Sequence, residues 1–137
     1  MQTDDLSKAP RAATIDSARP VAWTPPRETA RFDPAPLERL YADLGPVSAE
    51  QAVCRALDTL TARLEDARRA DGAARAAAAR GAQGVAREVG LTSLAAAAHA
   101  AADAAHDPVA AAATFGRLER MADASMAAIW DMGSDSA

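Results

Sequence analysis

The residues best able to do chemistry in this 137-residue chain are its two histidines, His99 and His106. An imidazole can bind a metal ion, change its charge near neutral pH or accept a phosphoryl group. The two lie seven residues apart, about two helical turns, so on one helix they would share a face. The sequence has no Glu-x-x-His pair, which dinuclear metal sites in helical bundles use. We therefore expect surface histidines, and a metal or pH-sensing site and a relocated phosphoacceptor stay open as alternatives.

No arrangement of side chains typical of an enzyme occurs in the sequence. It lacks a glycine-rich phosphate loop, a Ser/His/Asp set with a supporting signature and paired carboxylates that would share a pocket. Cys54 is the only cysteine, so neither an internal disulfide nor a cysteine metal cluster is expected, and its neighbours Val53 and Leu57 predict a half-buried thiol. We expect no catalytic residues, no metal ligands and no cofactor.

A second group of residues shares one face of a helix predicted over residues 73–89. Steps of three and four bring together the candidate partner-binding residues Ala76, Arg80, Gln83, Gly84 and Arg87. A glycine inside a helix costs about 1 kcal/mol relative to alanine. Gly84 therefore indicates close packing against another helix, a docked partner or a residue retained from an ancestor, and Gly81 weakens the same helix further.

Residues 80–91 read Arg-Gly-Ala-Gln-Gly-Val-Ala-Arg-Glu-Val-Gly-Leu and resemble the signature helix of histidine phosphotransfer (HPt) domains. That signature runs His, two residues, Lys, Gly, a small pair and a closing Leu-Gly. Gly84 matches the signature glycine, and residues 89–91 match the closing turn. However, Arg80 stands where the family has its phosphorylated histidine, and Gln83 stands where it has its lysine.

Other segments resemble the family in the same order, so that the resemblance covers residues 32–131. Residues 32–40 are similar to its leading helix, residues 60–64 with Asp71-Gly72 to its second helix and following turn, and residues 118–120 to part of its last helix. The resemblance implies an HPt-like antiparallel four-helix bundle with a short leading helix. It also implies a degenerate member of bacterial phosphorelay signalling, which binds a response-regulator receiver domain or a histidine kinase without carrying phosphate.

The missing histidine decides what such a domain can do. A phosphotransfer histidine projects from its helix so that a receiver's aspartyl phosphate can reach the imidazole. Arg80 stays protonated and cannot take over this chemistry, but it could enter the acidic pocket of a receiver and form charge-assisted hydrogen bonds there. The alternative for this residue is a solvent-exposed cap on a vestigial site. The alternative is a structural helical module that self-associates through alanine-rich faces. The sequence leaves the oligomeric state open.

The apolar pattern and the helix-breaking residues predict a short leading helix followed by four longer ones. Their predicted limits are Asp33-Pro34 to Gly45-Pro46, Ser48 to Asp71-Gly72, residues 73–89, Thr92 through Ala105, and Asp107-Pro108 to Gly133. Connections of about two to four residues make neighbouring helices antiparallel.

Composition supports an all-α fold and excludes some partners. Half of the residues are apolar, only 4% are aromatic, and alanine, the best helix former, is the commonest apolar residue. The net charge of −4 argues against nucleic acid as a partner. No apolar run approaches the roughly 20 residues that cross a membrane, and acids occupy the start of the chain where a secretory signal would be basic. We expect a cytoplasmic protein that does not bind membranes.

The predicted domain limits follow from the prolines, all of which except Pro108 lie in the first 46 residues. Residues 1–31 have no apolar period and predict a tail that is disordered or loosely packed, with Trp23 as its only large aromatic residue. Residues 32–132 form the predicted HPt-like bundle, and residues 133–137 form a C-terminal tail.

Overall fold

The computed structural model describes residues 29–136, with side chains as far as Asp131, and this part of the chain contains five α-helices and no strand. The helices are α1 (Ala35–Leu44), α2 (Pro46–Arg69), α3 (Gly72–Glu88), α4 (Thr92–Asp103) and α5 (Pro108–Ser136). The all-α prediction is therefore confirmed for these residues. Most of the predicted tail, residues 1–28, lies outside the described residues.

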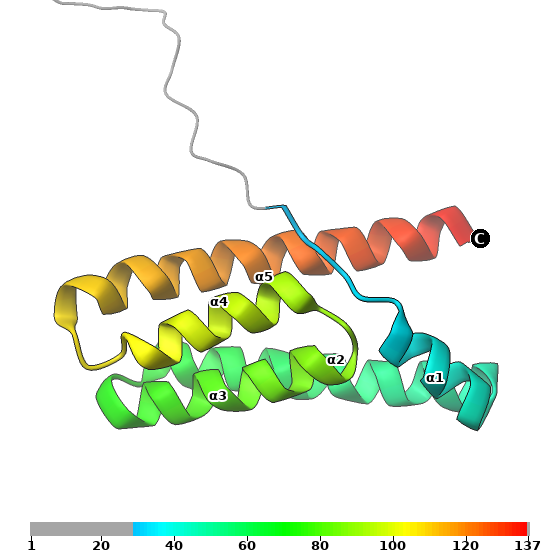
Figure 1. Ribbon diagram of the computed structural model, residues 1–137, viewed down its shortest axis with the longest axis horizontal. Helices are drawn as coiled ribbons and strands as arrows, with labels where there is room; N and C mark the ends of the chain where they lie inside the picture. The colour runs from blue at the N-terminus through cyan, green and yellow to red at the C-terminus, as the bar shows by residue number, and fades with distance from the viewer. Residues whose placement is uncertain (1–28, 137) are drawn as a thin grey trace, which may run out of the picture.

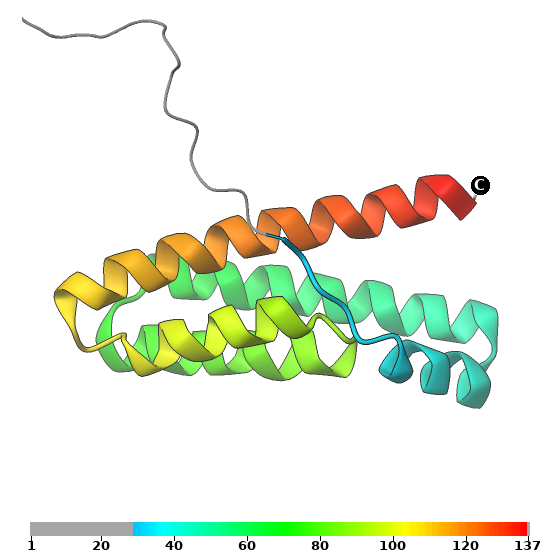
Figure 2. The same ribbon diagram turned by 45° about the horizontal axis from the view of Figure 1, so that its top comes forward.

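The four longer helices pack side by side along one long axis, and each runs opposite to the one before it (Figure 1). α2 lies beside α3, α3 beside α4, and α4 beside α5, while α1 folds against α2 (Figure 2). The backbones of α2 and α5 do not approach each other as closely as these neighbours do. The result is a helical bundle with one wider seam, between α2 and α5.

Small side chains allow α3 and α4 to pack closely. Fully buried alanines such as Ala79, Ala82 and Ala98 occupy their shared interface, where larger residues would push the backbones apart. The largest fully buried side chains are Leu60, Leu91, Leu94, Leu118 and Ser125. Ser125 is the exception in chemistry, because its hydroxyl is buried without a hydrogen-bond partner among the described residues.

The turn between α3 and α4 depends on Gly90, whose φ of +80° lies in the left-handed region. Its amide donates to the carbonyl of Arg87 at 3.1 Å, and the amide of Leu91 donates to that of Ala86 at 2.8 Å, which closes the end of α3. The amide of Asp33 in turn donates to the carbonyl of Gly90 at 2.8 Å. This hydrogen bond attaches the segment before α1 to the turn between α3 and α4.

Arg31 belongs to this hydrogen-bonded segment although it was predicted to be part of the tail. The amide of Arg31 donates to Oγ of Ser93 at 2.8 Å, and Oγ1 of Thr92 donates to the carbonyl of Arg31 at 3.1 Å. The start of α4 therefore anchors the chain at Arg31, one residue before the predicted bundle begins. This contact joins residues far apart in sequence, so no local pattern indicated it.

Three local predictions were wrong. The predicted C-terminal tail is helical as far as Ser136, because a single glycine, Gly133, weakens a helix by only about 1 kcal/mol and does not by itself end it. Conversely, α4 ends at Asp103, before Ala105, because residues 104–107 form the turn in which Asp107 caps α5 by accepting hydrogen bonds from the amides of Val109 and Ala110. Cys54 is exposed on α2 instead of half-buried, because α5 does not close over that part of the helix. No helix in residues 29–136 has the length and apolar character needed to cross a membrane.

Candidate functional site

Arg80 lies in the middle of α3 with its guanidinium directed toward the end of α4. Its Nη2 lies 3.1 Å from Oδ1 of Asp103, the last residue of α4. The two side chains are 54% and 55% exposed, so this is a surface ion pair. Such a pair contributes about 0–1 kcal/mol, and a partner can open it at little cost.

Asp103 also holds His99, one helical turn earlier. Its Oδ2 lies 3.1 Å from Nε2 of His99, and Nδ1 of the same ring lies 3.4 Å from Nε2 of Gln83 on α3. A neutral imidazole with its proton on Nε2 satisfies both contacts, since it donates to the carboxylate and accepts from the amide. We refer to Arg80, Asp103, His99 and Gln83 as the polar cluster.

The polar cluster is arranged for holding charge and not for nucleophilic attack. Both ring nitrogens of His99 are engaged, so accepting a phosphoryl group would first require the loss of one of these contacts. The guanidinium of Arg80, by contrast, reaches the surface and can exchange one carboxylate for another. The arrangement is therefore suited to binding an acidic group.

Two glycines on α3 have different surroundings. A Cβ at Gly81 would lie 2.9 Å from Cδ of Arg63, which crosses from α2, so this glycine accommodates a neighbouring side chain. A Cβ at Gly84 would meet nothing within 4 Å, and the residue is exposed. Close packing against another helix, one of the three explanations for Gly84, is therefore excluded among the described residues.

The five candidate partner-binding residues do not all reach the surface. Arg80, Gly84 and Arg87 are exposed, Ala76 is half-buried, and Gln83 is buried with 9% of its surface accessible. Gln83 was expected to face a partner, but the rotation of α3 against α4 turns it toward the interface instead. There it positions the imidazole of His99.

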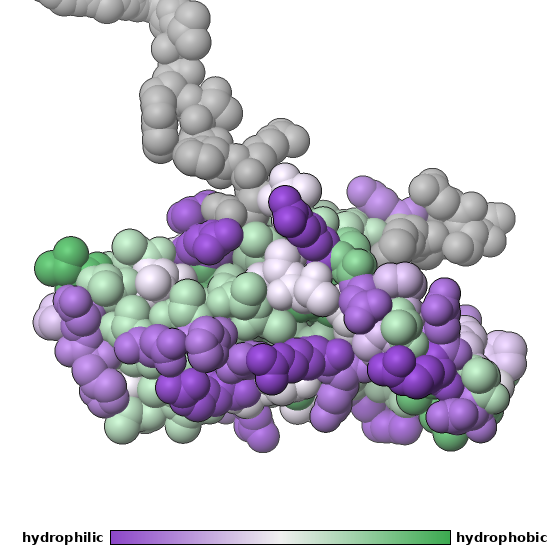
Figure 3. All heavy atoms as spheres, in the orientation of Figure 1, coloured by the Kyte–Doolittle hydropathy of each residue, from purple (hydrophilic) through white to green (hydrophobic). Residues whose placement is uncertain are grey.

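Sequence reasoning missed the contribution of α4 to this site. His99 and Asp103 are separated by four residues on one predicted helix, which is the spacing of facing side chains, and this was the available signal. Hydrophilic side chains gather in a band over α3 and the adjoining edge of α4 (Figure 3). A hollow of about 390 Å³ continues this site, and its walls are Gln83, Arg87, Thr92, Ala95, Ala96 and His99.

His106 does not join His99. Because α4 ends at Asp103, His106 lies in the following turn, exposed beside Asp107 and not on the face of α4 that carries His99. Within residues 29–131, no three side chains of His, Cys, Asp or Glu come together in a way that could hold a metal ion.

Comparison of the chain with models of protein families, with curated proteins and with solved structures gave no match. The resemblance to HPt domains therefore rests on the sequence features described above.

Proposed function

We propose that this chain is an HPt-like interaction protein that binds a receiver domain through the exposed face of α3 and does not itself carry phosphate. The face consists of Arg80, Gly84 and Arg87, with the half-buried Ala76 at its margin. A histidine kinase that presents the same acidic chemistry is the alternative partner. The observation that carries the proposal is the open surface at Gly84.

Gly84 lowers the stability of α3, and no contact within the described residues gives a reason for it. It is helical, its φ is not positive, and no atom of the described chain occupies the space that a side chain would fill. Alanine would stabilise the helix by about 0.5–1 kcal/mol at such a position. A docked partner supplies a reason for the glycine, because the backbone of that partner can approach α3 closely only where no side chain stands.

Arg80 supplies the charge next to this open surface, one turn earlier on the same helix. The phosphoacceptor site of a receiver is a cluster of carboxylates that normally holds Mg²⁺. When Arg80 leaves Asp103 for this cluster, one carboxylate partner is replaced by several, in a contact from which water is excluded. Arg87, about two turns from Arg80, adds attraction at the edge of the same face.

Titration with a purified receiver domain tests the proposal. Replacing Arg80 by alanine should weaken binding about 10- to 100-fold, because a charge-assisted hydrogen bond contributes about 1.5–3 kcal/mol. Arg39→Ala, which removes an exposed arginine of α1, is the matched control and should leave the affinity unchanged. Millimolar Mg²⁺ should weaken binding of the unsubstituted chain more than that of Arg80→Ala, since the ion and the guanidinium compete for the same carboxylates.

Three results would contradict the proposal. If the unsubstituted chain and Arg80→Ala bind the receiver with equal affinity, with and without Mg²⁺, Arg80 takes no part in the contact. Transfer of labelled phosphate from a phosphorylated receiver to His99 or His106 would contradict a protein that carries no phosphate. Concentration-dependent sedimentation of the chain alone, without receiver binding, would instead support a self-associating structural module.

A further inference from the structure

The wider seam between α2 and α5 forms a continuous groove that the bundle leaves uncovered. Its larger part has a volume of about 680 Å³, and the smaller part, which shares Thr61 and Met126 with it, adds about 160 Å³. We refer to both parts together as the α2–α5 groove. It contains no residue of α3, so it is separate from the face around Arg80 and does not depend on the proposed function.

The groove exists because the helices differ in length. α2 has 24 residues and α5 has 29, whereas α3 has 17 and α4 has 12. The first half of α2 and the second half of α5 therefore extend beyond the α3–α4 pair, where α1 is the only other described helix beside them (Figures 1 and 2). The apolar stripes of both helices continue into this region without a helix between them.

The floor of the groove is apolar and its open end carries a tryptophan. Leu57, Met126 and Ile129 are half-buried against the core, and Trp130 at the rim is 76% exposed. Exposure of such a large aromatic side chain beside a hollow is typical of a protein contact site, where tryptophan contributes more binding energy than most residues.

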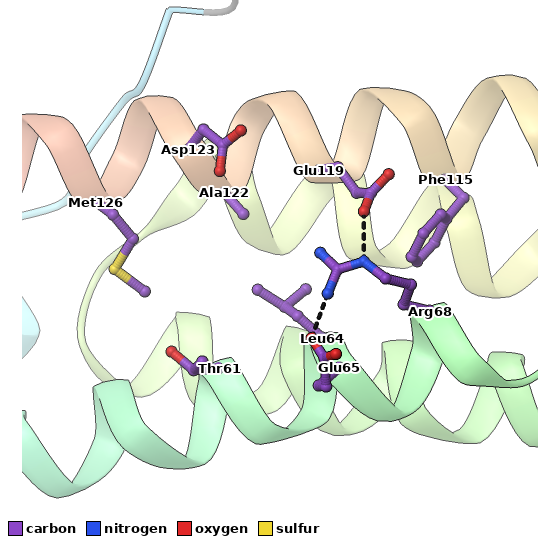
Figure 4. A pocket seen from close by; sticks show the side chains of 9 residues that line it. All are labelled: Thr61, Leu64, Glu65, Arg68, Phe115, Glu119, Ala122, Asp123 and Met126. Carbon is purple, nitrogen blue, oxygen red and sulfur yellow. Dashed lines mark hydrogen bonds and ion pairs between the residues drawn. The ribbon is translucent and has the colours of Figure 1, made fainter.

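One end of the groove is closed by an ion pair. Nε of Arg68 on α2 donates to Oε2 of Glu119 on α5 at 2.9 Å, and the same guanidinium binds Glu65 (Figure 4). The hydrogen bond with Glu119 and then the charge of Glu65 raise the pKa of Arg68 above its ordinary value. Arg68 is the only basic residue that lines the groove within the described chain, and its charge is already neutralised.

The remaining charges around the groove are acidic. Glu50 and Asp58 on α2 and Asp123 on α5 line it and are exposed. No ion pair engages any of these three carboxylates within the described residues. An occupant must therefore combine an apolar surface with positive charge on its flanks.

We propose that the α2–α5 groove binds an amphipathic helix of a partner protein, with an apolar stripe against Leu57 and Ile129 and with lysines or arginines facing the acidic rim. From Glu50 to Leu64, α2 rises about 21 Å, which matches a helix of about 14 residues. Such a helix supplies the element that a longer α3 or α4 would have placed there.

Two other occupants fit the described features less well. A second copy of this chain would bring the same acidic rim against Glu50 and Asp58, and like charges would repel. The chain's own N-terminal segment leaves the described structure at Thr29, which lies with Arg117 and Met121 on the α4 side of α5, away from the groove.

A pair of synthetic peptides of about 14 residues tests the proposal. Both carry leucines along one helical face, with lysines on the flanks of one peptide and glutamates on the flanks of the other. With the full chain, the lysine peptide should bind about tenfold or more tightly than the glutamate peptide, and the difference should shrink as salt is added. It should also slow alkylation of Cys54, which lines the groove and is the only cysteine in the chain.

Matched variants locate the contact. Trp130→Ala should weaken binding of the lysine peptide about tenfold, whereas Val109→Ala, at an 83% exposed position near the other end of α5, should not. The double variant Glu50→Gln with Asp58→Asn should reduce the preference for lysine over glutamate. Asp43→Asn with Glu88→Gln changes the net charge equally at exposed positions outside the groove and should preserve that preference.

Equal binding of the two peptides, or binding unaffected by Trp130→Ala, would overturn the proposal. Protection of Cys54 that rises with protein concentration in the absence of peptide, together with a dimer in sedimentation, would assign the groove to a second copy. Faster alkylation of Cys54 in a Trp23→Ala variant without peptide would assign it to the chain's own N-terminal segment. Either of these outcomes would also overturn the proposal that the groove binds a helix of a partner protein.

Discussion

Replacement of Gly84 by alanine should stabilise the fold and weaken partner binding at the same time. The residue is helical and exposed, and an added Cβ would meet no atom of residues 29–131 within 4 Å. The gain in helix stability should therefore be undiminished by strain, at about 0.5–1 kcal/mol. For a domain of this size, the midpoint of thermal unfolding should rise by about 2–6 °C.

Gly81→Ala is the matched control, three residues earlier on the same helix. Its Cβ would lie 2.9 Å from Cδ of Arg63, so the arginine must shift, and we expect this shift to disturb its ion pair with Asp66, at 3.6 Å. That exposed pair contributes about 0–1 kcal/mol, which offsets most of the gain from alanine. We expect little net change in the free energy of unfolding.

Urea unfolding followed by circular dichroism, paired with receiver titration, measures both effects. Gly84→Ala should raise the free energy of unfolding and lower receiver affinity, whereas Gly81→Ala should change both only slightly. If Gly84→Ala raises the free energy of unfolding no more than Gly81→Ala does, the claim that the space around Gly84 is open would be contradicted. If it stabilises and leaves receiver affinity unchanged, the glycine is not kept for docking, and the proposed function loses its main support.

Three further substitutions test the packing by urea unfolding. Gly90→Ala should lower the free energy of unfolding by more than about 2 kcal/mol, because φ is positive and a Cβ would lie 2.1 Å from the carbonyl oxygen of Asp33. A smaller loss would contradict the close contact between Asp33 and Gly90. Ser125→Ala should stabilise by about 0.5–2 kcal/mol, because the buried hydroxyl has no hydrogen-bond partner in the described part of the chain, and destabilisation would contradict this. Arg75→Ala should cost about 1–2 kcal/mol through loss of a 4.4 Å contact with the ring of Phe115 and a 3.0 Å hydrogen bond to a carbonyl of α2, and a neutral effect would contradict both contacts.

The number and order of the helices could be predicted because their limits are local. Alanine is common throughout the described chain and favours helix wherever it stands. The glycines and prolines between the alanine-rich segments therefore decide where each helix ends. Gly45, Gly72 and Gly90 all adopt positive φ, which only a glycine does without strain. Gly133, by contrast, is helical and does not have a positive φ. The helix continues through it, so the predicted end of the last helix was wrong.

The polar cluster could be predicted only in part. Arg80 was identified from its place in the helix, but its partner Asp103 lies on another helix and depends on the register across the turn at Gly90. The direction in which Gln83 points depends on how α3 is rotated about its axis against α4. Alanines occur on several faces of α3, so several rotations would bury side chains of the same size. Sequence periodicity does not fix that rotation.

The α2–α5 groove had no signal in the sequence. It arises from the unequal lengths of helices that become neighbours only in the folded bundle, and from the wider spacing of α2 and α5. The pattern around Cys54 is apolar enough to predict burial, but α5, which runs along this part of α2, does not pack closely against it. Its exposure is therefore a tertiary property.

The most direct test of the proposed docking face is a nuclear magnetic resonance titration of the isotope-labelled chain with a receiver domain. Glycine amide signals fall in a sparsely populated part of the spectrum, so Gly81, Gly84 and Gly116 can be followed separately from the many alanines. We predict that the signals of Arg80, Gly84 and Arg87 shift or broaden first, while Gly116 on α5 is unaffected. Shifts that are absent, or confined to α2 and α5, would contradict the proposal that this protein binds its receiver through the exposed face of α3.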